Sequence, residues 1–278
     1  MDTPTDLPIR FLETEEIAPD THVVRQLSGE GTAPVAVHVN TMVITGEEPV
    51  IVDTGPSLTR SGWLEHAFAV VDPADVRWVY LSHDDVDHAG NVLEVLDRCP
   101  HATLVTNWFS VERMAADTPL PLDRMVWVND GESFRAGDRE LVAVTPPVYD
   151  SPTTRGLFDA STGVYWAADA LGSPVTHQVD DIRDLDPGFF REAFLGQQLM
   201  ISPWMQWVDP AKYTVAIERV RALGATTVAS CHGVTLRGGQ VDSALNLMTE
   251  LPYLPPHEWP GQAELDAIHE AMAGATAA

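Results

Sequence analysis

The chain has 278 residues, of which 45% are hydrophobic, so it is long enough and apolar enough to bury a large globular core. Its formal net charge of −25 argues against nucleic acid and anionic membranes as partners, because both are negatively charged themselves. Only two cysteines occur, Cys99 and Cys231, which excludes a disulfide framework and favours a reduced, cytoplasmic setting.

The first half of the chain predicts short strands that alternate with helices. The start, MDTPTDLPIR, lacks the positive and then apolar stretches of a signal peptide, and no apolar run reaches membrane-spanning length. We expect strands at 34–45, 47–55 and 76–82, and helices at 61–71 and 89–99.

The second half continues the same alternation. We expect strands at 103–106, 125–128, 140–145, 163–168 and 225–230, and helices at 108–116, 188–200 and 210–223. A Pro-rich crossing at 251–261 precedes a helical tail at 262–273. Without repeats or flexible linkers, residues 1–278 are expected to form a single domain, with a core over about 20–250 and the crossing and tail at 251–278.

The segment LSHDDVDHAG, residues 81–90, concentrates metal-binding side chains after a predicted strand and before a predicted helix. It contributes His83, Asp85, Asp87 and His88. Strand, polar loop and helix is the order in which open sheets present functional groups at the carboxyl ends of their strands. The alternative is an acidic turn that only caps a helix.

Further predicted strands also break into polar residues, most of them beside glycine. These residues are Asp53 in VIVDTG, Asp150 after ELVAVTPPVY, Asp169 in VYWAADALG, and Cys231 and His232 in TTVASCHGV. If these ends share one edge of a sheet sandwich, their side chains meet the loop of residues 83–88.

The loop resembles the signature of the metallo-β-lactamase superfamily, which usually reads His-x-His-x-Asp-His. The motif DTG at 53–55, the strand end at Asp169 and CHG at 231–233 are similar to its other motifs, so the resemblance covers about Val37 to Val234. It implies an α/β fold, the αββα four-layer sandwich, with a two-metal site at one edge.

Within that superfamily, the chain is closer to flavodiiron proteins and to flavin-free oxygen-binding diiron proteins, which have an acidic residue in place of the second histidine. Here that residue is Asp85. The spacings are similar too: 61 residues separate His88 from Asp150, 18 separate Asp150 from Asp169, and 62 separate Asp169 from His232. The chain departs at Asp150, where the family has a histidine, so Asp150 either replaces that ligand or is ordinary turn chemistry before Ser-Pro.

The resemblance implies a metal ligand set. It places His83, Asp85 and Asp150 on metal one, Asp87, His88 and His232 on metal two, and Asp169 between the two metals. Asp53 is expected to orient loop groups through hydrogen bonds without ligating, and His88 remains open to either role. No catalytic residue is expected beyond these ligands.

The carboxylates bear on the choice of metal. Carboxylate oxygens favour iron or manganese over zinc, and four ligating aspartates would balance the charge of two divalent ions. We therefore expect two metal ions, with iron preferred and manganese or zinc as alternatives.

The expected function is to bind, sense or reduce dioxygen or nitric oxide, or to oxidise a small substrate, which makes an oxidoreductase the leading class of enzyme. The chain has no room for a flavodoxin domain, so we expect no bound flavin and an external electron donor; the resemblance also implies a homodimer. The alternative is a hydrolase that cleaves a thioester, lactone or phosphoester with a metal-bound hydroxide.

Two other features allow more than one interpretation. Cys231 is interpreted as a small buried residue, although its place before His232 would suit a metal or redox role. Tyr149, Trp204, Met205 and Trp207 could form an aromatic wall over the metals, but core packing is favoured for the last three.

Overall fold

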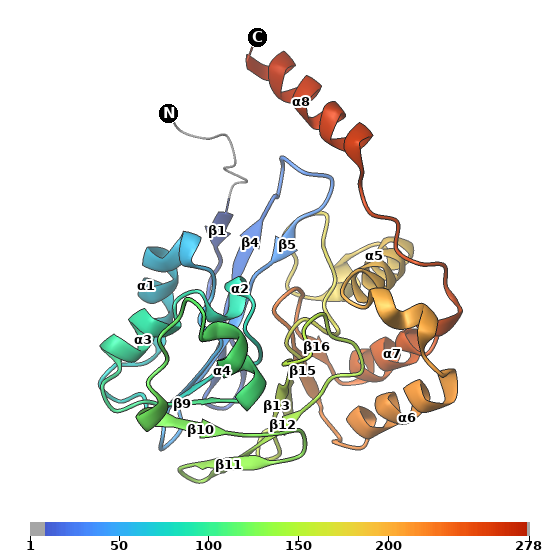
Figure 1. The fold of residues 1–278 in the computed structure, drawn as a ribbon. Helices are drawn as coiled ribbons and strands as arrows, with labels where there is room; N and C mark the ends of the chain where they lie inside the picture. Colours follow the sequence, from blue (N-terminus) through green and yellow to red (C-terminus); the bar gives the residue numbers. More distant parts are fainter. Residues whose placement is uncertain (1–8, 277–278) are drawn as a thin grey trace.

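Two β-sheets face each other in the computed structural model, which describes residues 9–276 (Figure 1). The first sheet has seven strands in the order β10-β9-β8-β7-β6-β3-β2, and its strands β7 to β10 run parallel. Its strands are β2 (Glu15–Ala18), β3 (Thr21–Val24), β6 (Thr41–Ile44), β7 (Val50–Val52), β8 (Trp78–Tyr80), β9 (Thr103–Thr106) and β10 (Met125–Trp127).

The second sheet has six strands in the order β11-β12-β13-β14-β15-β16, with one parallel pair, β14 and β15. Its strands are β11 (Ser133–Ala136), β12 (Arg139–Val144), β13 (Gly156–Asp159), β14 (Val164–Trp166), β15 (Thr227–Ala229) and β16 (Leu236–Arg237). A small third sheet joins β1 (Ile9–Phe11), β4 (Gln26–Ser28) and β5 (Val37–His38).

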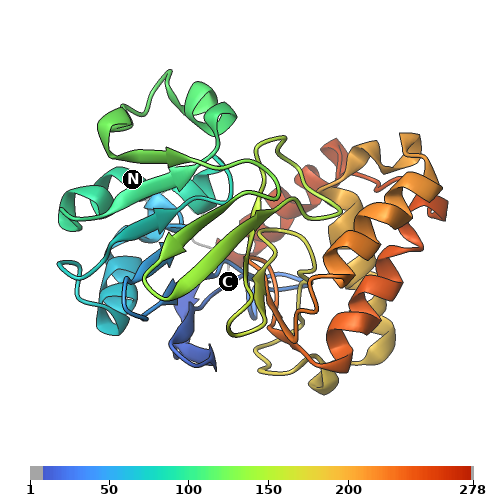
Figure 2. The ribbon, with the colours of Figure 1, turned by 90° about the horizontal axis from the view of Figure 1, so that it is seen from below.

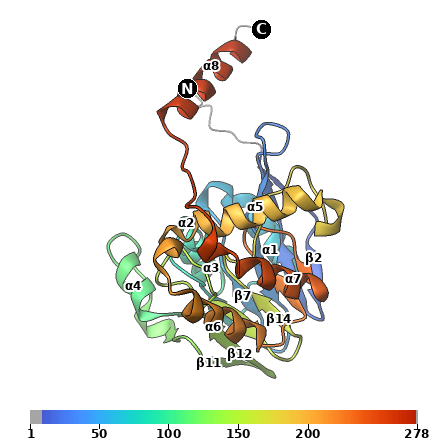
Figure 3. The same cartoon turned by 90° about the vertical axis from the view of Figure 1, so that its right-hand side faces the viewer.

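Helices cover the outer face of both large sheets, which Figure 2 shows from below. The helices are α1 (Arg60–Val70), α2 (Val86–Ala89), α3 (Val92–Arg98), α4 (Trp108–Met114), α5 (Pro187–Met200), α6 (Pro210–Arg221), α7 (Gly239–Met248) and α8 (Gln262–Thr276). Short 3-10 turns occur at Ser57–Thr59, Leu122–Arg124, Ile182–Asp184, Pro203–Trp207 and Leu251–Tyr253. The helix α8 projects away from the body, and its described side chains are exposed (Figure 3).

Three apolar layers hold the sandwich together. Helices α1 and α3 pack on the first sheet through Trp63 and Val95, while α5 and α6 pack on the second through Phe194 and Ile217. Between the sheets, fully buried residues from both sides form the central layer, among them Val52, Tyr80, Leu141 and Trp166. These layers make the sheets rigid, so the loops that leave them at one edge are held in place.

Several helices begin where the sequence supplies a cap. The side chains of Asn107, Asp186 and Asp209 accept hydrogen bonds from backbone N–H groups in the first turns of α4, α5 and α6. Pro187 and Pro210 take the first position of α5 and α6, where a missing N–H costs nothing.

The predicted fold class is confirmed, since helix, sheet, sheet and helix layers follow one another. The helix predicted at 89–99 differs in detail, because α2 begins inside the ligand-rich loop and α3 starts only at Val92. No helix within residues 9–276 is long and apolar enough to cross a lipid bilayer.

Candidate metal centre

The predicted ligand side chains come together at the edge where the strands of both sheets end. Because β7 and β8 are parallel and β14 and β15 are parallel, their carboxyl ends deliver loops to the same place. The loop after β8 and the short helix α2 supply His83, Asp85, Asp87 and His88, and the loops after β12, β14 and β15 supply Asp150, Asp169 and His232.

One group of side chains surrounds the ring of His83. Its Nε2 atom lies 3.6 Å from Asp85 Oδ2, 3.9 Å from Asp150 Oδ1 and 3.3 Å from Asp169 Oδ2. The ligand atoms of His83, Asp85 and Asp150 lie within 4.8 Å of one another, close enough to share one cation, and we call this place position one; Asp169 forms a separate group with His83 and His88.

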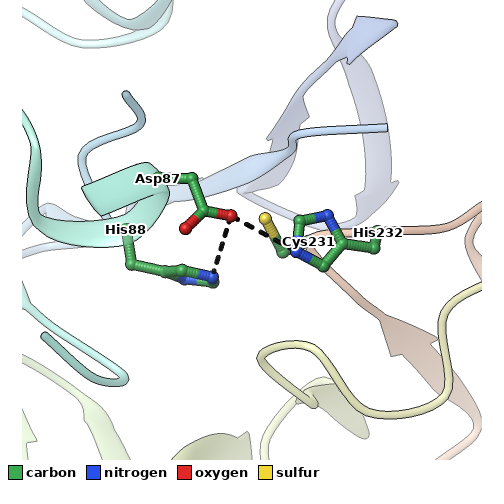
Figure 4. Close-up of side chains that lie close together, drawn as sticks. All are labelled: Asp87, His88, Cys231 and His232. Atoms are coloured by element: carbon green, nitrogen blue, oxygen red, sulfur yellow. Dashed lines mark ion pairs between the residues drawn. The ribbon is translucent and has the colours of Figure 1, made fainter. Parts of the chain in front are cut away.

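A second group lies on the other side of Asp169. His88 Nε2 is 2.8 Å from Asp169 Oδ1 and 3.6 Å from Asp87 Oδ2, and His232 Nε2 is 3.2 Å and 3.3 Å from the same two oxygens. Figure 4 shows Asp87 between the two rings. We call this place position two, and the two oxygens of Asp169 thus face different positions.

Each of the three histidines holds its Nδ1 atom against the protein. The contacts are His83 Nδ1 to Ser82 Oγ at 3.0 Å, His88 Nδ1 to Asp53 Oδ2 at 2.9 Å, and His232 Nδ1 to the His38 carbonyl at 2.9 Å. A carbonyl only accepts, so Nδ1 of His232 carries the proton. His88 lies between two carboxylates, with Asp53 at Nδ1 and Asp169 Oδ1 at Nε2, so in its protonated form it donates from both nitrogens. A metal ion at Nε2 would replace the proton there and leave the one on Nδ1. Nε2 of His83 is buried and has no hydrogen-bond partner.

Asp53 ties this arrangement together from behind. It is fully buried, and it accepts hydrogen bonds from the Ser82 backbone N–H at 2.7 Å, from Ser82 Oγ at 2.8 Å and from Trp166 Nε1 at 2.9 Å, besides its contact with His88. Its φ of 59° is unusual for a residue with a side chain, which is typical of strained positions at functional sites.

The charges of the site oppose one another. Burial alone would raise the pKa of Asp169, but His88, His232 and His83 hold it well below its usual value. Burial alone would lower the pKa of His88 and of His232, but nearby anionic groups, Asp169 among them, raise both well above their usual value.

Two further carboxylates of the site, Asp87 and Asp150, shift their pKa in opposite directions. Burial would raise the pKa of Asp87, but His88 and His232 lower it to about 2. Burial and the neighbouring Asp169 raise the pKa of Asp150 to about 6. Position one therefore concentrates negative charge that its single histidine does not offset.

The donor set fits a pair of metal ions. Among the residues that the structure describes, no lysine or arginine pairs with Asp85, Asp87, Asp150 or Asp169, whose ionic partners are all histidines. Four carboxylates gathered without a fixed cation would repel one another, and an orphaned, buried imidazole nitrogen lacks a partner. Two cations, one at each position, would neutralise the carboxylates and give the imidazole nitrogen a partner.

The alternatives to ligation can be compared with the geometry. Asp85 is the N-cap residue of α2, but its side chain makes no capping hydrogen bond and is 38% exposed beside His83. Asp150 accepts a hydrogen bond from the Ser151 N–H at 2.8 Å, which is turn chemistry, while it also faces His83. Asp84 points elsewhere, toward Arg113 at 2.5 Å and Thr153 at 2.6 Å.

The sequence did not indicate every residue of the site. Ser82 and Trp166, which hold Asp53, carry no motif signal, and Cys231 Sγ falls within the group of Asp87, His88 and His232. The preference for core packing was wrong for Trp207, whose side chain is 83% exposed, but right for Met205, which is buried.

Tyr149 and Trp204 pack against each other next to Asp150, with ring centroids 5.1 Å apart. The indole N–H of Trp204 also donates to the Tyr149 carbonyl at 3.2 Å. The pair therefore braces the loop that carries Asp150.

Comparison with known proteins agrees with this fold. The family model described as Metallo-beta-lactamase superfamily matches residues 34–232. The chain is 26% identical over 242 residues, 81% of its length, to a putative diflavin flavoprotein A 1 of Nostoc sp. strain PCC 7120, of which this covers 39%. It is 21% identical over 134 residues, 48% of its length, to the anaerobic nitric oxide reductase flavorubredoxin of Pectobacterium atrosepticum, of which this covers 26%.

Among solved structures, the rubredoxin oxygen:oxidoreductase of Desulfovibrio gigas is similar with a TM-score of 0.76 and 18% identity, covering 88% of this chain and 62% of that one. The chain thus spans less than half the length of the two curated relatives named above. The match of the superfamily model over most of the chain, on a sandwich with its predicted ligands at one edge, identifies the protein as a member of the metallo-β-lactamase superfamily that resembles flavodiiron proteins.

Proposed function

We propose that the chain is a diiron protein that binds, senses or reduces dioxygen or nitric oxide at positions one and two. The observation that carries the proposal is Asp169, whose two carboxylate oxygens face two separate groups of nitrogen and oxygen donors. The four aspartates favour iron over zinc, and the proteins that the chain resembles include a rubredoxin oxygen:oxidoreductase and a nitric oxide reductase.

The residues at the two positions would have different tasks. His83, Asp85 and Asp150 would hold one ion, Asp87, His88 and His232 the other, and Asp169 would bridge them. The iron pair would supply redox chemistry and open coordination positions for a diatomic ligand. Ser82, Asp53 and the His38 carbonyl would keep each imidazole turned so that its Nε2 faces a metal.

Access to the site is easier at position one. At position two the side chains of Asp87 and His232 are 29% and 15% exposed and that of His88 is buried, whereas at position one those of Asp85 and Asp150 are 38% and 35% exposed. A small ligand would therefore reach the metals from the side of these two aspartates, and buried rings would exclude water behind them. The electron donor would be a separate protein or small reductant.

The test is to load metal-free protein with iron under anaerobic conditions and to measure metal content and visible absorption. We expect two iron ions per chain and a change in absorption when the reduced protein meets dioxygen or nitric oxide. Two bound ions that leave the spectrum unchanged with either gas, together with turnover of a thioester, lactone or phosphoester by the zinc or manganese form, would favour the hydrolase instead.

Two variants sharpen this test. Asp169→Ala removes the bridging carboxylate and should lose at least one of the two ions. Asp84→Asn alters the neighbouring aspartate that faces Arg113 and Thr153, so it should keep both ions. If Asp169→Ala retains two ions, the bridging assignment is wrong.

A further inference from the structure

We propose that Cys231 supplies a thiolate ligand at position two, so that the two metal positions differ in chemistry. Position one would be rich in oxygen donors, and position two would combine nitrogen, oxygen and sulfur. This inference rests on the metal pair of the proposed function but not on its gas chemistry.

The placement of the sulfur carries the proposal. Cys231 Sγ and one ligand atom each of Asp87, His88 and His232 all lie within 4.8 Å of one another. Figure 4 shows the sulfur beside the ring of His232, on the side that faces Asp87. Metal–sulfur and metal–nitrogen bonds of about 2.3 Å and 2.1 Å allow atoms this far apart to approach one ion with a small adjustment.

The backbone holds Cys231 in that place. Its N–H donates to the Ala168 carbonyl at 2.8 Å, and its own carbonyl accepts from the Asn40 N–H at 2.9 Å. The amide of Asn40 also donates to the carbonyls of Ser230 at 3.0 Å and Gly233 at 2.9 Å, on either side of Cys231 and His232. The same hydrogen bonds fix the backbone that carries His232, so Cys231 and His232 are presented to position two together.

Binding of the sulfur to a metal releases one proton and adds one negative charge to the ligand set. The thiol loses its proton to solvent, and a sulfur lone pair forms the bond to the metal. With Cys231 included, five anionic ligands would face two ions, giving one negative charge more than two divalent cations supply. The extra charge would favour a pair in which one ion is trivalent, and the sulfur would favour soft or borderline ions at position two.

The second cysteine provides a matched control. Both cysteines are buried in apolar layers: Cys231 lies in the central layer between the sheets, and Cys99 lies between α3 and the first sheet, with Val95 and Leu96. Burial raises its pKa to about 11, which keeps it a thiol. Among the residues that the structure describes, Cys99 belongs to no group of side chains that could share a metal ion.

The experiment titrates cobalt into metal-free protein under anaerobic conditions and records the near-ultraviolet band that thiolate-to-cobalt charge transfer produces. Wild type and Cys99→Ser should bind two cobalt ions and develop the band. Cys231→Ser should lose the band and bind one of its two ions more weakly, by at least the roughly 10- to 100-fold that loss of a partner behind a ligand costs.

Each outcome decides the matter. Two cobalt ions without the band in wild type, or a band that persists in Cys231→Ser, would overturn the thiolate ligand and leave the metal pair standing. Fewer than two ions in wild type would overturn the metal pair as well. Should Cys231→Ser fail to fold, X-ray absorption of zinc-loaded wild type decides, since ligation requires one sulfur at about 2.3 Å from zinc.

Discussion

The position of one proton decides whether an imidazole can bind a metal through a given nitrogen. In His88 the carboxylate of Asp53 holds the proton on Nδ1, and Asp53 in turn is held by Ser82 and Trp166. For a metal at position two, this chain of contacts would make Asp53 a positioning residue that acts through His88.

Replacing Asp53 with Asn tests that role. The amide can turn an N–H toward His88 Nδ1, which favours the tautomer with the proton on Nε2 and blocks its lone pair. We expect the affinity for one of the two ions to fall about 10- to 100-fold, measured by competition with a metal chelator. Trp166→Phe keeps the carboxylate and removes one donor, so its loss should be smaller; an equal loss would mean that packing, not the tautomer, is what Asp53 controls.

For single residues, the sequence allows the metal ligands to be predicted where they cluster, but not the residues that hold those ligands in place. Asp85, Asp87 and His88 could be selected because metal-capable residues rarely gather within one turn of chain. Trp166 and Asn40 could not, because an indole in a strand, or an amide just before one, looks the same in the sequence whether it fills the core or fixes a loop. The closeness of Cys231 to Asp87 depends on pairing between distant strands.

The approach of two loops at Gly172 and Gly233 governs where His232 stands relative to Asp169. A Cβ atom on Gly233 would lie 2.8 Å from the Gly172 Cα, and one on Gly172 would lie 2.8 Å from the His232 carbonyl oxygen. Both neighbours are backbone atoms, which cannot rotate aside, so only glycine permits this contact.

Gly233→Ala should therefore push the His232 loop away from the Asp169 loop. We expect a loss of stability of about 1–3 kcal/mol from the forced shift, together with weaker binding at one metal position. Thermal unfolding of the metal-free protein and metal titration measure the two effects separately.

Gly196→Ala is the matched control for Gly233→Ala. Gly196 lies inside α5, and a Cβ atom added there would meet no atom within 4 Å, so alanine should stabilise the helix by up to about 1 kcal/mol and leave metal binding unchanged. If Gly233→Ala binds both ions as wild type does, the contact of the two loops does not set the site.

The helices and strands that could be predicted are those whose own residues form a clear local pattern. The strand predicted at 103–106 coincides with β9, and α6 begins at Pro210 after the capping Asp209 as its sequence suggests. The helix α7 begins at Gly239 directly after the glycine N-cap Gly238, and β13 has only four residues beside turns, so neither has a local pattern strong enough to predict. Such elements form because neighbours in the sandwich offer them buried contacts and strand partners.

For the whole molecule, the site is a junction between its two halves. The first sheet delivers His83, Asp85, Asp87 and His88, and the second delivers Asp150, Asp169 and His232. Metals at positions one and two would therefore link the halves, and they would also neutralise carboxylates in a chain whose net charge is −25. Both effects stabilise the folded state over the unfolded one, in which these side chains lie far apart.

The metal-free protein should consequently unfold at a lower temperature than the loaded protein. An ion that binds only the folded state, at a free concentration 1,000 times its dissociation constant, contributes about 4 kcal/mol. For a chain of this size that corresponds to a rise of roughly 10 °C in Tm for each ion bound, measured by calorimetry with chelator and with iron under anaerobic conditions. The comparison is made at about 0.15 M salt, where charges beyond about 8 Å are screened, so that general neutralisation of the acidic surface contributes little. Asp169→Ala should lose most of the rise, whereas Asp84→Asn should keep it. An equal rise in all three proteins would mean that the ions bind the acidic surface and not the junction between the sheets.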